Sequence, residues 1–341
     1  MKRKGLLLFP AVFAMSLTAC ASNVHHEISE YIAGTIQYTS NFRILQLTDI
    51  HLGDKDNLDT HFKFMDLTIE EANPDMIVVT GDLFTFASKA TAKKFFDYLD
   101  SKGKPWTITY GNHDEQCYFS VDWLTSTLNK YGSHCLYKDI QDDDVQGNAN
   151  FAINLEKDGH LFEQLIVMDS NRYYFGSYFG YDYFKQDQID WYKDLVQYTK
   201  GQNGGVVVPS LMFYHIPLPE VNDAWERSQA GEADAIAVPF AVHNGDPAKY
   251  GERGEDPCNP KYNSGFFDVI LEQGSTTGMY FGHDHINNFI INYKGVDFAY
   301  GVKATDRVYY GDAMMGGRVI TLHDDHTTTY EDYYHTYAEV K

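Results

Sequence analysis

Apolar residues recur along this chain in two alternating patterns, one typical of buried strands and one typical of helices. Short apolar or β-branched runs predict strands at 41–47, 76–80, 106–110, 151–155, 165–168, 206–214 and 278–281. Apolar residues at helical spacing predict helices at 59–73, 89–102, 186–199 and 265–272. From residue 287 the pattern indicates strands alone, at 289–293, 296–300, 318–322 and 327–333. This order is typical of two packed sheets with helices outside.

Composition and charge narrow the class of protein. Hydrophobic residues make up 43% and charged residues 22% of the 341 positions, which excludes global disorder, a collagen-like fibre and a small disulfide scaffold. The formal net charge of −21 repels phosphate polymers, so we expect no binding of DNA or RNA. Without internal repeats or a dividing linker, 41–341 is interpreted as one domain. The oligomeric state stays open.

The N-terminus has the features of a targeting segment. Lys2, Arg3 and Lys4 precede an apolar stretch, 5–19, that is too short to span a bilayer comfortably. Small residues before Cys20 resemble the bacterial lipoprotein signal, in which cleavage precedes the cysteine and its sulfur receives a diacylglycerol. We therefore predict a signal peptide at 1–19, a lipid-anchored Cys20, a polar tether over 20–40 and an exported cell-surface or periplasmic protein. An ordinary secretory signal is the alternative.

Two further features concern the cysteines and one long segment. An oxidising compartment allows a Cys117–Cys135 disulfide, although we favour three reduced thiols, with Cys258 as the third. The segment 217–263 is rich in Gly, Pro, Glu and Asp and has weak periodicity. Long irregular segments in compact domains are usually lids, binding loops or disordered, so we expect one of these here.

Five short polar motifs each follow a predicted strand. In order, they are Asp49-Ile50-His51, Gly81-Asp82, Gly111-Asn112-His113-Asp114, Tyr214-His215 and Gly282-His283-Asp284-His285. In open α/β sheets, ligands bind at the carboxyl ends of strands, where loops from different strands meet. Imidazole with carboxylate suits Zn, Fe or Mn, and one carboxylate can bridge two such ions. The alternative is a set of polar residues that cap turns, but the joint pattern favours metal.

Together these motifs resemble the full signature of the calcineurin-like metallophosphoesterases, over about residues 42–322. Gly180-Tyr181-Asp182, His215-Ile216-Pro217 and Asn263-Ser264-Gly265 are similar to the small single-domain branch related to purple acid phosphatases. One position departs from that pattern. Thr85 stands where a purple acid phosphatase has the tyrosine that ligates ferric iron, three residues after Asp82, so we expect a colourless site.

The resemblance implies a fold, a ligand set and a mechanism. The fold would be a four-layer α/β/β/α sandwich of two mixed sheets. The ligands would be Asp49, His51 and His285 for the first metal ion, Asn112, His215 and His283 for the second, and Asp82 as the bridge between them. A metal-bridging hydroxide would be the nucleophile, so no covalent enzyme intermediate is expected. His113 would act as general acid, oriented by Asp114.

The resulting prediction is a metal-dependent hydrolase of small-molecule phosphate esters, with monoesters the first choice. Phosphodiesters could be cleaved by the same site. A non-catalytic metal-binding surface lipoprotein and a single-metal protein are the alternatives, which the complete motif set disfavours. Asp284 is expected to orient a ligand or face solvent rather than bind metal. The aromatic run containing Tyr173, Tyr174, Tyr178, Tyr181 and Tyr183 could line a substrate pocket or pack internally.

Overall fold

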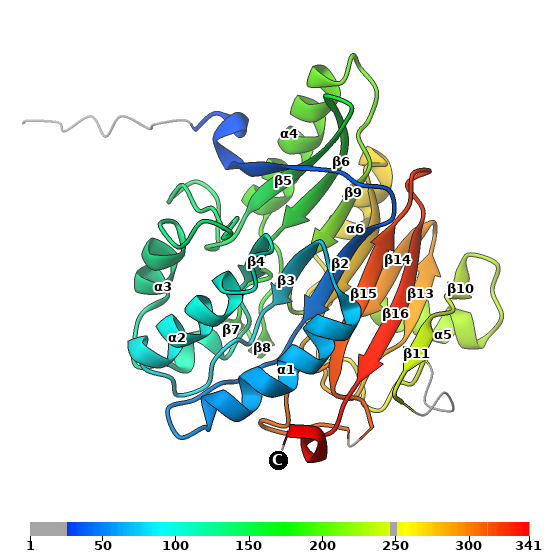
Figure 1. The fold of residues 1–341 in the computed structure, drawn as a ribbon. Coiled ribbons are helices and arrows are strands. Elements are labelled where there is room, and N and C mark those ends of the chain that lie inside the picture. The colour runs from blue at the N-terminus through cyan, green and yellow to red at the C-terminus, as the bar shows by residue number, and fades with distance from the viewer. Residues whose placement is uncertain (1–25, 246–250, 312, 341) are drawn as a thin grey trace, which may run out of the picture.

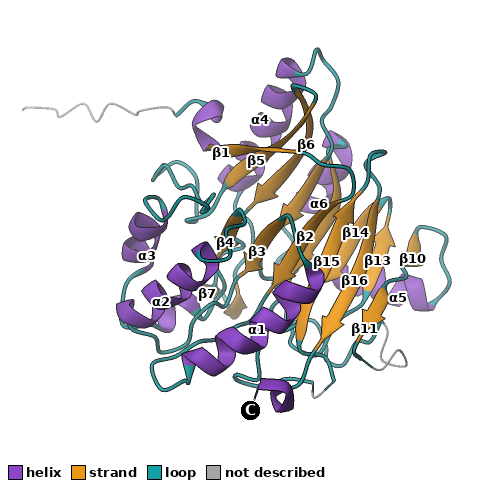
Figure 2. Cartoon of the chain, in the orientation of Figure 1, coloured by secondary structure: helices purple, strands orange, loops and turns teal. Residues whose placement is uncertain are grey.

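Two large β-sheets form the centre of the molecule, with helices on their outer faces (Figures 1 and 2). The structure is a computed structural model and describes residues 26–245, 251–311 and 313–340. The predicted signal peptide and Cys20 lie outside these ranges. In the described residues, the helices fall short of the combined length and apolar character that a bilayer span needs.

The first sheet has six strands in the order β11-β16-β15-β2-β3-β4. Its parallel half contains β2 (Phe42–Leu47), β3 (Met76–Thr80) and β4 (Trp106–Thr109). Its other half contains β15 (Gly316–Leu322), β16 (Thr328–Tyr334) and the edge strand β11 (Ala241–His243). The helices α1 (Leu58–Ala72), α2 (Lys89–Asp100) and α3 (Val121–Leu128) bury apolar side chains in the same core.

The second sheet has eight strands in the order β1-β5-β6-β9-β12-β14-β13-β10. Along the sheet these are β1 (Ile32–Gln37), β5 (Phe151–Lys157), β6 (His160–Val167), β9 (Ser210–Phe213), β12 (Thr276–Phe281), β14 (Val296–Tyr300), β13 (Ile290–Tyr293) and β10 (Ala235–Ala237). The strands β6, β9, β12 and β14 are mutually parallel. The helices α4 (Gln186–Gln202), α5 (Glu220–Gln229) and α6 (Phe266–Gln273) pack on this sheet.

The alternation of side chains between the two faces of the central strands explains the four layers. Phe213 of β9 and Tyr280 of β12 belong to the core shared by both sheets, whereas Met212 and Phe281 pack with α4, α5 and α6. Successive strand residues point to opposite faces, so each of these strands is buried on both sides. The predicted α/β/β/α arrangement of two mixed sheets is therefore confirmed.

Three segments differ from the sequence-based expectation. The prediction of a tether over 20–40 is wrong for Ile32–Gln37, because these residues form the edge strand β1, which pairs in parallel with β5. The residues of β1 are half-exposed and lack a clear apolar pattern, so the sequence did not indicate a strand there. The segment 217–263 is not simply irregular, since it contains α5, β10 and β11. These are short elements at sheet edges, where few side chains are buried and periodicity is weak. The helix α3 was also not anticipated.

Cys117, Cys135 and Cys258 are free thiols, as the favoured sequence interpretation had it. Burial raises the pKa of the Cys117 and Cys135 thiols to about 12. Because the thiolate is the reactive form, these two side chains are poor nucleophiles and metal ligands at neutral pH.

Candidate metal centre

The five polar motifs follow five strands that end at one edge of the sandwich. Asp49, Asp82 and Asn112 come just after β2, β3 and β4, which are parallel neighbours in the first sheet. His215 and His283 come just after β9 and β12, parallel neighbours in the second sheet. The packing of the two sheets therefore brings motifs separated by more than two hundred residues into one cluster.

The backbone at this edge turns sharply. Asp49, His51, Asp82 and His283 all have positive φ, between 50° and 80°, a conformation that is uncommon for residues other than glycine. Gly81 also has positive φ, and a Cβ there would lie 2.6 Å from the His215 ring. The Gly81 position thus lets the chain after β3 approach the chain after β9. Such strained turns are typical of functional sites.

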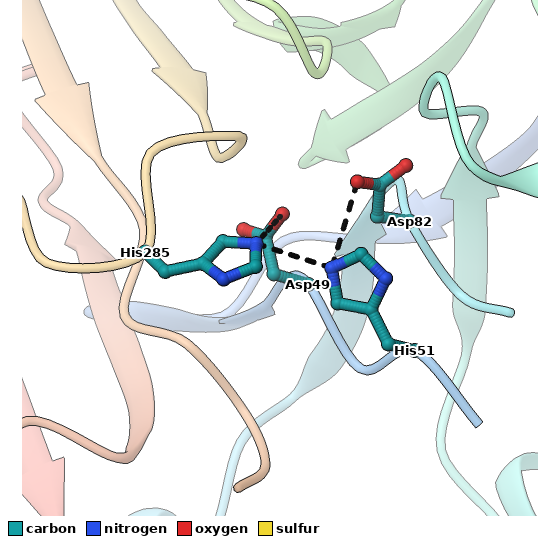
Figure 3. Close-up of side chains that lie close together, drawn as sticks. All are labelled: Asp49, His51, Asp82 and His285. Atoms are coloured by element: carbon teal, nitrogen blue, oxygen red, sulfur yellow. Dashed lines mark hydrogen bonds and ion pairs between the residues drawn. The ribbon is translucent and has the colours of Figure 1, made fainter. Parts of the chain in front are cut away.

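One group of four buried side chains surrounds the space between β2, β3 and the turn after β12 (Figure 3). It consists of Asp49, His51, Asp82 and His285, each of which can direct one ligand atom to within 4.8 Å of the others. His285 Nε2 lies 3.4 Å from Asp49 Oδ1 and 3.1 Å from His51 Nε2. Buried imidazoles and carboxylates converging in this way form a set suited to a transition-metal ion.

A second group shares one member with the first. Asp82, His215 and His283 also bring their ligand atoms within 4.8 Å of one another. Asp82 Oδ2 lies 3.6 Å from His51 Nε2 and 3.3 Å from His215 Nε2, whereas Oδ1 accepts the backbone N–H of His113 at 2.8 Å. A single carboxylate oxygen therefore stands between the two groups.

Two buried atoms in the cluster have no hydrogen-bond partner. Asn112 Nδ2 donates to the Tyr173 hydroxyl at 2.9 Å, so the amide oxygen of Asn112 points away from Tyr173. That oxygen has no hydrogen-bond partner among the described residues. His215 Nε2 likewise has no hydrogen-bond partner there, although it forms an ion-pair contact of 3.3 Å with Asp82 Oδ2. Buried polar atoms are normally satisfied, so these two atoms fit the positions of metal ligands.

A family model described as calcineurin-like phosphoesterase matches residues 42–301. The chain belongs to this family. It is 25% identical to the probable inactive purple acid phosphatase 14 of Arabidopsis thaliana, over 90% of this chain and 81% of that protein. It is 28% identical to the probable inactive purple acid phosphatase 29 of the same plant, over 76% of this chain and 71% of that protein.

A solved structure shares the fold. The dimetal phosphatase from Danio rerio aligns with a TM-score of 0.53 and 14% identity, covering 84% of this chain and 94% of that one. In this phosphoesterase, the buried Asp/His cluster is suited to a dinuclear metal site.

The rings of the phosphoesterase cluster are oriented by contacts on their far sides. His51 Nδ1 lies 2.9 Å from Thr85 Oγ1, His215 Nδ1 lies 2.8 Å from the Thr80 carbonyl oxygen, and His285 Nδ1 lies 2.8 Å from the Tyr309 carbonyl oxygen. Each contact leaves Nε2 directed to the cluster. Outer contacts of this kind fix the tautomer and orientation of metal-binding histidines.

Burial favours the metal-binding protonation state of His51 and His283, whereas the neighbouring Asp82 carboxylate raises the pKa of His215 to about 10. Burial lowers the pKa of His51, and it lowers the pKa of His283 to about 3, so both rings are neutral near pH 7 and keep a free nitrogen lone pair. For His283, the contact of Nε2 with the Cys258 carbonyl oxygen at 3.1 Å leaves Nδ1 as the ligand atom. Neutral imidazole is the form that coordinates metal.

Asp114 lies beside the cluster and bonds to the backbone rather than to the His113 ring. Its carboxylate accepts the backbone N–H groups of Gly111 at 2.8 Å and Phe84 at 3.0 Å, and burial raises its pKa to about 8. The expectation that Asp114 orients His113 is wrong. Gln116 does so instead, since its Oε1 lies 2.8 Å from His113 Nδ1. Asp114 ties the loop after β4 to the loop after β3.

Several residues at the site were missed or left open by sequence reasoning. Lys303 is buried, donates to the Asp49 carbonyl oxygen at 2.7 Å, and has its pKa lowered to about 8 by burial. Tyr309 stacks on His285, with ring centroids 4.1 Å apart. Neither belongs to a motif, so only the geometry reveals them.

Asp284 and the tyrosine-rich stretch also have defined places. Asp284 is buried and accepts the Tyr300 hydroxyl at 2.7 Å and the Cys258 backbone N–H at 3.0 Å, so it does not face solvent. The stretch forms the hairpin β7 (Tyr173–Phe175) and β8 (Phe179–Tyr181). Tyr173 contacts Asn112, and the Tyr181 ring meets the His283 ring edge-on at 4.4 Å. The hairpin therefore forms one wall of the metal centre.

Proposed function

We propose that this protein is a metal-dependent phosphatase that hydrolyses phosphate monoesters of small molecules. The observation that carries the proposal is the place of Asp82 Oδ2, between His51 Nε2 of one ligand group and His215 Nε2 of the other. That geometry suits one carboxylate oxygen shared by two cations. Only two of the seven proposed ligands are carboxylates, Asp49 and Asp82, so a bound cation pair keeps an excess of positive charge for an anionic phosphate.

The proposed ligands divide between two ions. Asp49, His51 and His285 hold one, Asn112, His215 and His283 hold the other, and Asp82 bridges them. When bound, two such ions lower the pKa of a water molecule and neutralise charge on phosphoryl oxygens. Zn, Fe and Mn all suit this donor set.

His113 is the proposed proton donor to the leaving alcohol. Its ring centroid lies 5.0 Å from that of His51, at the rim of the cluster, and it is absent from both ligand groups. In the protonated ring, Nδ1–H donates to Gln116 Oε1, which leaves Nε2–H for the departing oxygen. Gln116 is thus a positioning residue for His113.

Two other functions are compatible with the same site. A phosphodiesterase would use the same ligands and differ in the loops that receive the second ester group. The second is a metal-binding protein without turnover, because three plant relatives bear the word inactive in their names. The combination of seven candidate ligands with a hydrogen-bonded His113 favours an enzyme.

Metal content and turnover of the purified protein test this function together. We expect two metal ions per chain, no visible charge-transfer band, and hydrolysis of p-nitrophenyl phosphate faster than bis-p-nitrophenyl phosphate. A chelator should abolish hydrolysis, and adding back Zn, Mn or Fe should restore it. One ion per chain, or hydrolysis that survives complete metal removal, would contradict the dimetal phosphatase.

We also propose that the protein is exported and anchored to a membrane through a lipid on Cys20. The basis is the cationic and apolar order of residues 1–19 before that cysteine. In a bacterial host, Cys20→Ala should move the protein from the membrane fraction to the soluble fraction, while the wild type stays with membranes. Recovery of both forms in the same fraction would refute the lipid anchor.

A further inference from the structure

A cavity of about 360 Å³ opens directly beside the metal centre. Its surface is mostly apolar, and its lining includes His51, Thr85, Phe86, Tyr118, Arg307 and Val308. His51 belongs to the first ligand group, and Thr85 fixes the His51 ring. The cavity therefore adjoins the metal centre at the His51 ring. An engineered protein cavity of about 150 Å³ takes one benzene, so this volume accommodates a ring with its linker.

Three apolar side chains are exposed around this cavity. Phe86, Tyr118 and Val308 are 59%, 69% and 55% exposed. Phe86 and Val308 also have positive φ, +55° and +64°, and for a β-branched residue such as Val308 this is a true outlier. Folding alone gives no reason to expose large apolar groups on strained backbone next to a polar cluster. Strain of this kind is found where side chains are held for a ligand.

The loops that line the cavity are hydrogen-bonded to neighbouring loops, so the cavity is preformed. The Thr85 backbone N–H donates to the Leu52 carbonyl oxygen at 3.0 Å, which joins the loops after β2 and β3. A Cβ at Gly53 would lie 2.6 Å from the Thr85 carbonyl oxygen, so only glycine allows this approach. On the other wall, Thr305 Oγ1 donates to the Ile50 carbonyl oxygen at 2.7 Å. A preformed cavity loses less entropy on binding.

The charges around the cavity suit a neutral group attached to an anionic phosphate. Asp56 is paired with Arg307 at 2.8 Å and accepts the Gly53 backbone N–H at 2.7 Å. Asp54 Oδ1 accepts the Ser88 backbone N–H and the Thr91 hydroxyl, both at 2.7 Å. Both carboxylates are engaged, and Lys55 adds a positive charge to the lining. The cavity therefore does not add to the repulsion that the chain's net charge exerts on phosphate.

We propose that this cavity receives the alcohol part of the substrate, and that this alcohol carries a ring-sized apolar group, preferably aromatic. The inference rests on the proposed function and names its substrate class. His51 lines the cavity and its ring lies 5.0 Å from that of His113, so the proposed proton donor and the cavity share a neighbour. Phe86 and Tyr118 supply aromatic faces for the ring.

Two pairs of compounds test the subsite. 2-Phenylethyl phosphate and ethyl phosphate are esters of primary alcohols, so their leaving groups have similar basicity and differ in the ring. We expect kcat/KM to be about 10-fold or more higher for the phenylethyl ester, a difference typical of an apolar pocket. The matching phosphonates cannot be hydrolysed, and calorimetry on the metal-loaded protein should show the same preference in Kd.

Phe86→Ala should lower the phenylethyl preference about 10-fold in both measurements, mainly through KM. Phe175→Ala is the matched control, since Phe175 is a 78% exposed phenylalanine on the β7–β8 hairpin that does not line the cavity. The control should keep the wild-type preference. If Phe175→Ala removes the preference and Phe86→Ala keeps it, the hairpin holds the ring and the assignment of this cavity is wrong.

The failure of this inference differs from the failure of the proposed function. Equal kcat/KM for the two esters and equal Kd for the two phosphonates would overturn the subsite while the phosphatase activity stands. The opposite outcome is also possible to recognise. If neither ester is hydrolysed, but the protein binds the phenylethylphosphonate more tightly and Phe86→Ala removes that preference, the proposed activity is overturned and the subsite is supported.

Discussion

Asp82→Asn is expected to lower both the metal content and the rate of hydrolysis strongly. The substitution preserves the shape of the side chain but removes the charge of the carboxylate whose Oδ2 stands between His51 and His215. Two neighbouring cations would then repel each other without the shared anion. We expect fewer than two ions per chain and a fall in kcat/KM of about 10³-fold or more, which corresponds to roughly 4 kcal/mol of transition-state stabilisation.

Elemental analysis and steady-state kinetics measure the two effects on the same preparation. Asp297→Asn is the matched control, because Asp297 is another buried carboxylate whose partners, Asn292 and Tyr330, lie away from the cluster. The control should bind two ions per chain. An Asp82→Asn protein that keeps two ions and wild-type turnover would show that Asp82 does not bridge metals.

The cluster of candidate ligands could be predicted from sequence because each candidate follows a strand. The end of a buried strand is visible as the end of an apolar run, and parallel strands bring their carboxyl ends to one edge. Asp49, Asp82 and Asn112 follow three neighbouring strands of one sheet, and His215 and His283 follow two of the other. Strand ends therefore predict the convergence within each sheet, whereas the meeting of the two sheets at one site was implied by the family resemblance.

Contacts between loops could not be predicted in this way. His113 and Asp114 are adjacent in sequence, yet their side chains point to different partners. The short 3₁₀ turn η2 (Asp114–Gln116) begins there, and residues three apart lie above one another in such a turn, which places Gln116 beside His113. Lys303 reaches Asp49 from a segment without a motif, and only the packing of the two sheets reveals that contact.

His113→Ala should separate proton donation from metal binding. The His113 ring belongs to neither ligand group, so the variant should retain two ions per chain. Its kcat should fall about 10²- to 10⁴-fold for alkyl phosphates, whose alkoxide leaves only if it is protonated. For p-nitrophenyl phosphate the fall should be smaller, because nitrophenolate is stable enough to leave without a proton.

The leaving-group dependence distinguishes proton donation from other roles of His113. A ring that only stabilised charge on the phosphoryl group would lower kcat equally for alkyl and nitrophenyl esters, and that result would refute the general acid. Gln116→Ala provides an intermediate case, since it keeps the imidazole but removes the acceptor at Nδ1. We expect this variant to show the same ordering of substrates with smaller losses, because the ring still donates but is no longer held in one orientation.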